Sequence, residues 1–215
     1  MAIAFDAKSQ AGPFTSGATQ SVTQTCTGSN LILIAGVTYT GSISAATYNS
    51  VAMTLLAART INGQNYAMYY LVNPSTGSNN LSFTSSGVVL GLVGASYTGA
   101  KQTGQPDSTN NSQTAGSSAT VTDTIINTNC WLIGIGGAQG TGFSTFSSGD
   151  TERTQVVDAP NDWGLDISDK NGVVSVGSNS LSWSANSAGA TGGIVMGLLA
   201  TDSALPANGN MLLVM

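Results

Sequence analysis

The chain has 215 residues, of which 41% are hydrophobic and only 7% are charged, against about a quarter charged in an average soluble protein. Ser, Thr, Asn, Gln and 27 glycines take the place of the missing charges. The net charge is −5 and the five basic residues are scattered, which argues against nucleic-acid binding, because that needs clustered Lys and Arg. The uncharged polar composition suits contact with copies of the same chain or with carbohydrate.

The N-terminus lacks the charged and long apolar regions of a signal peptide. No run approaches about 18 apolar residues, so we expect neither a transmembrane helix nor a membrane partner. We therefore expect synthesis in a cytoplasm without a standard export signal. The protein would stay there, leave with a carrier structure, or be released by lysis.

Strand signals fill the first half of the chain, and helical patterns are nearly absent. β-branched and aromatic runs are punctuated by Gly, Asn, Ser and Pro, as in all-β proteins. Asn49 and the pair Asn62-Gly63 predict tight hairpin turns, and residues 73–77 predict a further turn. The predicted strands of this half are 2–7, 21–27, 31–39, 45–48, 52–60, 66–72, 81–84 and 88–97.

Residues 98–118 are polar, contain Pro106 and show no apolar alternation, so they predict a connecting linker. Residues 203–215 form a tail that ends in five apolar residues. Between them, the predicted strands are 119–126, 131–138, 151–157, 164–168, 173–176, 181–184 and 193–201.

Three blocks of the first half recur in the same order about 100 residues later. The pairs of blocks are 30–34 with 129–133, 77–83 with 177–183, and 87–92 with 193–198. The repeat predicts two duplicated halves, 1–100 and 117–202. Each half would carry one apolar face, so we expect them to pack face to face as a single antiparallel β-sandwich over residues 1–215, with jelly-roll or Greek-key topology. Two small sandwiches in tandem are the alternative.

The repeat also assigns individual residues. The third block is continuously apolar, as in a strand buried on both sides, and its glycines Gly91 and Gly197 indicate close backbone approach or a bulge. Phe83 and Trp183 occupy equivalent positions, which predicts core roles for both. Trp131 replaces an isoleucine of the repeat, which also predicts the core.

Catalytic signals are weak. The chain has no histidine, which excludes Ser-His-Asp and Cys-His catalysis and most zinc sites. Glu152, beside Asp150 and Arg153, is the one candidate for a glycan-cleaving carboxylate pair, but this spacing is more simply a solvated turn. We expect no enzymatic activity and no cofactor.

Metal sites are also weakly indicated. Cys26 and Cys130 lie one in each half, and buried reduced thiols are favoured over a bridge between the halves. Four acidic residues could offer oxygen ligands to a structural Ca²⁺, although solvated loop and strand-edge positions are favoured for them and we predict no metal. These residues are Asp158, Asp162, Asp166 and Asp169.

Two segments are candidates for binding. Trp163 lies in an apparent loop beside Asp162 and near Asn161, a combination found in sugar-stacking platforms and in protein interfaces. At the C-terminus, an apolar segment at a free end needs cover, either from the chain's own sheet or by strand addition to a neighbouring subunit. It consists of Met211, Leu212, Leu213, Val214 and Met215.

Residues 47–54, Thr-Tyr-Asn-Ser-Val-Ala-Met-Thr, and 69–77, Tyr-Tyr-Leu-Val-Asn-Pro-Ser-Thr-Gly, resemble a β-sandwich domain that recurs in tailed-phage virion proteins and related bacterial surface proteins. The resemblance covers mainly residues 20–100. It implies a structural role, as a capsid decoration protein or a subunit of a tail or fibre, and it transfers no catalytic residue.

Together these features predict a non-enzymatic virion protein, assembled in the host cytoplasm, that decorates the head. Its polar, weakly charged faces would contact other copies, and its terminal segments would attach it to a major capsid or other virion protein. The alternative is a carbohydrate-binding module or a tail-fibre or adhesin domain, with Trp163, Asp162 and Asn161 as the glycan site.

Overall fold

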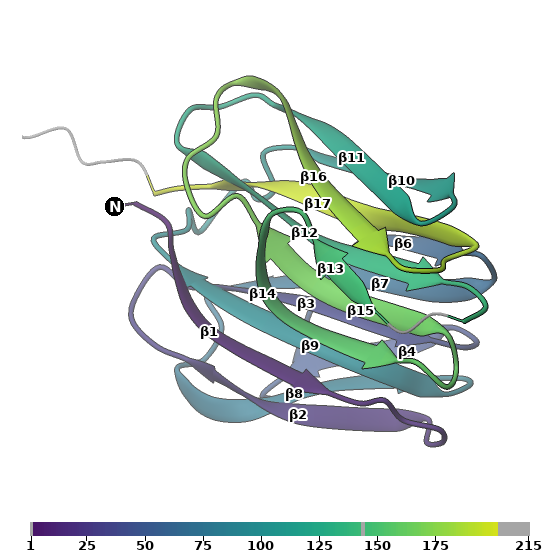
Figure 1. Ribbon diagram of the computed structural model, residues 1–215. Helices are drawn as coiled ribbons and strands as arrows, with labels where there is room; N and C mark the ends of the chain where they lie inside the picture. Colours follow the sequence, from purple (N-terminus) through teal and green to yellow (C-terminus); the bar gives the residue numbers. More distant parts are fainter. Residues whose placement is uncertain (1, 143–144, 202–215) are drawn as a thin grey trace, which may run out of the picture.

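The computed structural model describes residues 2–142 and 145–201, and this part of the chain is all-β (Figure 1). The strands of the first half are β1 (Ala4–Ala11), β2 (Thr19–Cys26), β3 (Ile32–Tyr39), β4 (Ile43–Tyr48), β5 (Val51–Ala52), β6 (Thr54–Ile61), β7 (Gln64–Val72), β8 (Gly77–Ser85) and β9 (Val89–Thr98). Those of the second half are β10 (Thr109–Ala115), β11 (Ser118–Ile125), β12 (Cys130–Gln139), β13 (Phe146–Ser148), β14 (Thr151–Asp158), β15 (Trp163–Asp169), β16 (Gly177–Ala185) and β17 (Ala190–Leu199).

Each half is a two-sheet antiparallel sandwich with jelly-roll strand order. The first half has sheets β1-β9-β3-β7-β6 and β2-β8-β4-β5, and the second has β10-β17-β12-β15-β14 and β11-β16-β13. Strand for strand the two orders match, except that β5 has no counterpart among the described strands of the second half. The predicted fold class and duplication are therefore confirmed.

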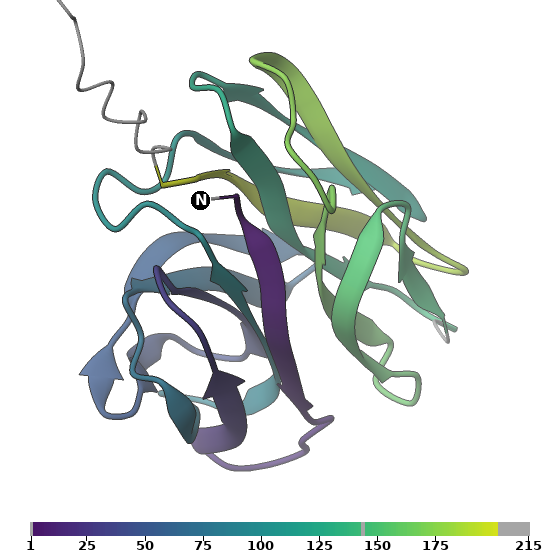
Figure 2. The same cartoon turned by 90° about the vertical axis from the view of Figure 1, so that its left-hand side faces the viewer.

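The two halves pack through their five-stranded sheets, so the molecule has four layers (Figures 1 and 2). The expectation that each half supplies one sheet of a single two-layer sandwich is corrected. Each half has enough strands to enclose a core of its own, and only its larger sheet has a second apolar face that needs cover. The fold thus combines two small sandwiches with the expected face-to-face packing.

Three hydrophobic cores separate the four layers. Strands β3, β9, β12 and β17 are buried along almost their whole length, because one face of each points into its own half and the other points between the halves. In β3, for example, Leu33 lies in the core of the first half, whereas Ile32 and Ile34 lie in the central core. This confirms that the recurring apolar blocks are buried on both sides.

An approximate twofold axis relates the halves. Strand β1 lies against β14, and β6 lies against β10. In the matched strand orders, β1 corresponds to β10 and β6 to β14, so the two contacts are equivalent. This arrangement is that of an isologous dimer, here within one chain.

The tight turns form where the sequence predicts them. Asn49 and Ser50 join β4 to β5 with φ of 48° and 64°, and Asn62 and Gly63 join β6 to β7 with φ of 45° and 87°. Positive φ at both central residues defines the hairpin turn that matches strand twist. These turns fix the register of the strands that they connect.

Three segments differ from the sequence-based expectation. Residues 109–115, inside the expected connection, form β10, and residues 146–148 form the short strand β13. Residues 173–176 contain only a single bridge, between Val174 and Cys130. The sequence does not predict β10, because it is a polar edge strand with mostly exposed side chains and therefore shows no apolar alternation. It pairs only with β17.

Candidate functional site

The acidic set of the second half is mostly buried, so the expectation of solvated positions is wrong for three of its four members. Asp158, Asp166 and Asp169 are 3%, 0% and 0% exposed, and Asp162 is partly exposed. No group of three or more His, Cys, Asp or Glu in the described ranges is placed to hold a metal ion. The buried carboxyl groups are engaged within the protein instead.

Asp169 joins the two halves. Its carboxylate accepts two hydrogen bonds from Arg153, at 2.7 and 2.8 Å, and one of 2.8 Å from the Tyr97 hydroxyl of the first half. A bulge in β14 at Arg153 turns this side chain inward, and its guanidinium lies 4.5 Å from the ring centre of Phe5. Burial, above all, raises the pKa of Tyr97 well above its ordinary value, so the hydroxyl remains a donor to the carboxylate.

Asp166 is buried within the second half. Its Oδ1 accepts a 2.7 Å hydrogen bond from the Gly136 amide, whereas its Oδ2 has no partner. Burial is the main cause of a pKa raised well above the ordinary value of an aspartate, with a smaller contribution from Glu152. Burial therefore favours the protonated form of this carboxyl group more strongly than in an ordinary aspartate.

Glu152 lies near enough to Asp166 to contribute to the raised pKa of that aspartate. It accepts a 2.6 Å hydrogen bond from Gln155, on the edge strand β14. Asp150 forms a 2.5 Å ion pair with Lys170 and accepts a hydrogen bond from the Ser182 amide. These contacts give the region a structural explanation.

Trp163 is the first residue of β15 and is only 2% exposed, which corrects its expected place in a loop. A Cβ atom added to Gly91 of the first half would lie 2.7 Å from the indole ring, so the ring fills the central core. Asn161 is exposed and donates to Asp158 at 2.7 Å, and Asp162 is the residue with φ of 60° before the strand. A sugar ring therefore has no access to the indole face in this structure.

The other assignments from the repeat are confirmed. Phe83, Trp183 and Trp131 are 0%, 1% and 7% exposed. Gly91 makes the close approach described above, and a Cβ atom on Gly197 would lie 2.7 Å from Ile125. These positions serve packing.

Cys26 and Cys130 are both buried free thiols, as favoured from the sequence. Burial raises the pKa of each thiol, and that of Cys130 reaches about 12. The thiols are therefore protonated and poor nucleophiles.

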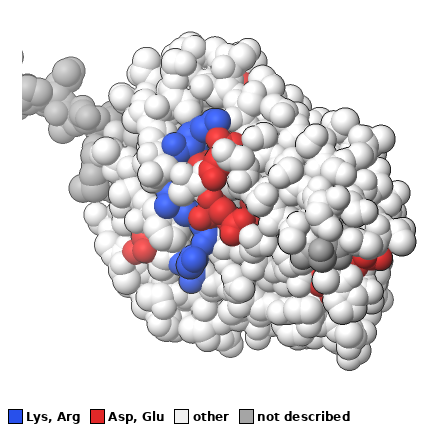
Figure 3. All heavy atoms as spheres, viewed as in Figure 1, with Lys and Arg blue, Asp and Glu red and all other residues white. Residues whose placement is uncertain are grey.

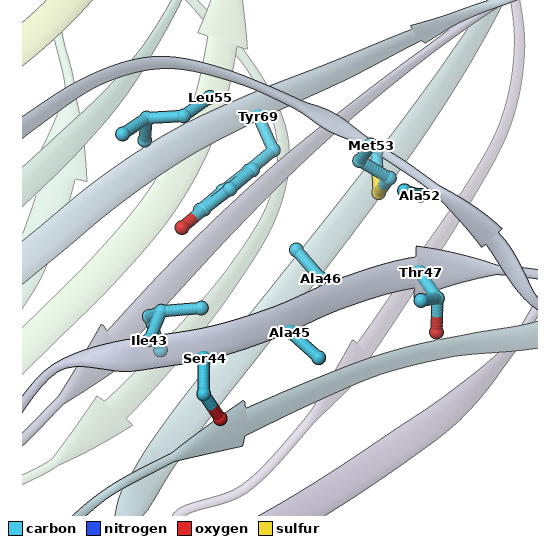
Figure 4. A pocket seen from close by; sticks show the side chains of 9 residues that line it. All are labelled: Ile43, Ser44, Ala45, Ala46, Thr47, Ala52, Met53, Leu55 and Tyr69. Carbon is cyan, nitrogen blue, oxygen red and sulfur yellow. The ribbon is translucent and has the colours of Figure 1, made fainter.

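The first half contains a groove that the sequence pattern does not predict (Figure 4). It lies between β4 and β6, at the place where the chain crosses from one sheet to the other through β5. Its volume is about 330 Å³, and none of its lining residues is charged. We call it the β4–β6 groove; it is lined by Ile43, Ser44, Ala45, Ala46, Thr47, Ala52, Met53, Leu55 and Tyr69.

The exposed faces of the two outer sheets share one chemistry. Thr25 and Ser78 on the first half are joined by a 2.8 Å hydroxyl contact, and Thr122 and Ser180 on the second by one of 2.7 Å. Because the outer sheets are the first and last of the four layers, these uncharged hydroxyl-bearing faces lie on opposite sides of the molecule.

Charged side chains visible in Figure 3 gather mainly in one band across the middle of that face, over the neighbouring strands β1 and β14. Two ion pairs lie in this region, between Arg153 and Asp169 and between Lys170 and Asp150. The band follows the seam between the halves and leaves most of this face uncharged.

Large exposed apolar side chains occur near the last described residues. Ile126, Val173 and Val176 are 65%, 60% and 53% exposed. They lie in the loops around the Cys130–Val174 bridge, and residues 127–129 line a small hollow together with Leu199 to Thr201. The candidate contact residues Met211 to Met215 lie outside the described residues.

Comparison with family models, curated protein sequences and solved structures found no significant match to this chain. None of the described residues belongs to a helix long and apolar enough to span a lipid bilayer. The described part of the chain is all-β with two jelly-roll halves, and its surface features are candidates for function.

Proposed function

We propose that the protein is a non-enzymatic structural component of a virion and that it decorates the head. The observation that carries this proposal is the pair of uncharged, hydroxyl-bearing outer sheets on opposite sides of the molecule. Such faces can contact neighbouring subunits on two sides without charge repulsion. Jelly-roll sandwiches are also a fold of viral capsid proteins.

The three cores and the buried contact between the halves support this role, since a particle subunit must keep its shape under load. The resemblance of residues 47–54 and 69–77 to virion sandwich domains agrees with it. In this proposal the polar faces contact other copies, and the apolar segment Met211 to Met215 contacts a neighbouring subunit of the particle.

Quantitative mass spectrometry of purified particles tests the proposal. We expect the chain in the particle at a copy number of the same order as that of the shell protein, and we expect cryo-electron microscopy to place it on the outside of the head. Absence from purified particles would overturn the proposal. Enzymatic release of reducing sugar, lost in Glu152→Gln, or binding on a glycan array would redirect it to the other classes.

A further inference from the structure

The β4–β6 groove lies beside an incomplete sheet edge. β4 pairs with β8 along one side, whereas β5 pairs with it on the other side only at Thr47 and Tyr48. The Met53 amide also donates to the Ala46 carbonyl, at 2.9 Å. Among the described strands none covers residues 43–45 on that side, so their outward backbone groups are open to an added extended segment.

The groove itself selects apolar side chains. Figure 4 shows Ile43 and Ala46 of β4 facing Met53 and Tyr69, and Leu55 stands at the rim with 50% exposure. No lining residue is charged, so a charged side chain would lose hydration without gaining a partner. Methionine is adaptable in shape, which suits a groove that receives mixed aliphatic side chains.

The chain carries a segment of matching chemistry. Residues 203–215 contain no charged residue, and Met211 to Met215 are five apolar residues in succession. An extended strand places alternate side chains on one face, so two or three of the five would enter the groove while the backbone bonds to the open edge. This mode of recognition is strand addition.

We propose that Met211 to Met215 of one copy dock in the β4–β6 groove of a neighbouring copy. The proposal deepens the proposed function, on which it rests for the presence of neighbouring copies. It assigns the apolar segment to contact between like subunits and gives that contact a direction, from the end of one chain to the first half of the next.

The strand register favours a neighbour over the same chain. The Thr201 amide bonds to the Gly99 carbonyl, just past β9, whereas Leu55 lies level with Gly94 through the pairs of β6, β7, β3 and β9. Leu55 and the Thr201–Gly99 contact are thus three strand spacings apart across the sheet and five residues apart along it. Together these give a straight-line distance of roughly 22 Å through the protein. A random-coil chain of nine residues, the number between Thr201 and Met211, has a typical span of about 15–18 Å, and a path round the sheets would be longer.

The test measures self-association of the purified full chain by sedimentation velocity over a range of concentrations. We expect concentration-dependent oligomers that Leu55→Asp weakens by at least about tenfold, because the new charge would be buried in an apolar contact. Leu213→Asp should have the same effect. Val51→Asp is the matched control for the groove, since Val51 is also 50% exposed but does not line it, and Ala207→Asp is the control for the tail.

A mixing experiment identifies the partners. Chains with Ala45→Cys and chains with Leu213→Cys, mixed under mild oxidation, should form a disulfide-linked heterodimer, and neither variant alone should form it with wild-type chains. Circular dichroism confirms that each variant is folded. The proposal would be overturned if the protein stayed monomeric at all concentrations or if its oligomers were insensitive to Leu55→Asp. It would also be overturned if a chain carrying both Ala45→Cys and Leu213→Cys formed only an internal disulfide and the mixed single variants formed none. The particle copy number tests the proposed function separately, so either idea can fail alone.

Discussion

The Tyr97 hydroxyl of the first half donates a 2.8 Å hydrogen bond to the Asp169 carboxylate of the second half, and Arg153 holds the same carboxylate through two further bonds. This contact is a buried polar tie between the halves beside the hydrophobic central core. Its two buried partners are 0% exposed, and the Arg153 side chain is only 12% exposed.

Removing one partner of this tie should lower the stability of the folded protein. Asp169→Asn leaves the guanidinium without its counter-ion, and we expect a loss of about 3–5 kcal/mol in the free energy of unfolding. Tyr97→Phe should cost about 1.5–3 kcal/mol. Lys170→Ala, which removes a more exposed ion pair, is the control and should cost less than about 1 kcal/mol. Urea denaturation measures all three, and equal losses would contradict the role of the tie.

Asp166 should make stability depend on pH. Its pKa is raised in the folded protein, so the unfolded chain releases the proton first, and stability should fall as pH rises from the ordinary aspartate pKa of about 4 toward the folded pKa. Asp166→Asn preserves the acceptor for Gly136 and removes this titration. The variant should therefore gain stability relative to the wild type as the pH rises above about 4. Parallel stability curves for the two proteins would refute the prediction.

The two thiols should be silent in the folded state. Both are buried with raised pKa values, and thiolate is the reactive form. We expect negligible reaction with Ellman's reagent at pH 8 in buffer and reaction of two thiols per chain in 6 M guanidinium chloride. Rapid reaction of either thiol in buffer would show that the structure around it is open.

Gly91 should tolerate no side chain, because an added Cβ would lie 2.7 Å from the Trp163 ring. We expect Gly91→Ala to destabilise the protein by about 1–3 kcal/mol. Adding Trp163→Phe should recover part of that loss, since the two sites are in contact. Gly172→Ala is the control, because its nearest atom beyond its chain neighbours is 3.9 Å away. Additive effects of Gly91→Ala and Trp163→Phe in thermal denaturation would contradict the packing.

The sequence predicts those parts of the fold that depend on local chemistry or on the repeat. Asn49 and Asn62 predict hairpin turns because asparagine is one of the few residues other than glycine that readily adopt positive φ. Phe83 and Trp183 are recognisable as core residues because they occupy one position of the repeat. The duplicated sandwich follows from such positions.

Tertiary context decides what the sequence leaves open. Trp163 follows a Pro-Asn-Asp segment and resembles a loop residue, but the second five-stranded sheet brings it against Gly91. Asp169 resembles a solvated residue, but a bulge turns Arg153 toward it. Partners distant in sequence cause both outcomes.

The repeat also relates two aspartates that hold loops. Asp6 accepts a 2.8 Å hydrogen bond from the Thr27 amide, and Asp107 accepts one of 2.7 Å from the Ile126 amide. The two aspartates are 101 residues apart and hold equivalent loops. A comparison of the acidic residues across the repeat would have separated these loop-holding aspartates from the buried ones. The β4–β6 groove has no such signal, because it arises from a gap between sheets.

The approximate dyad also bears on how the molecule can evolve. In a true homodimer every substitution appears at both ends of the contact, so a new charge must be accommodated twice. Fusion into one polypeptide lifts that constraint. Here the Arg153–Asp169 pair contacts Tyr97 at one end of the interface between the halves. The equivalent strand positions at the other end carry Leu56, Tyr70 and Leu198, so the charged pair occurs at one end and not at the other.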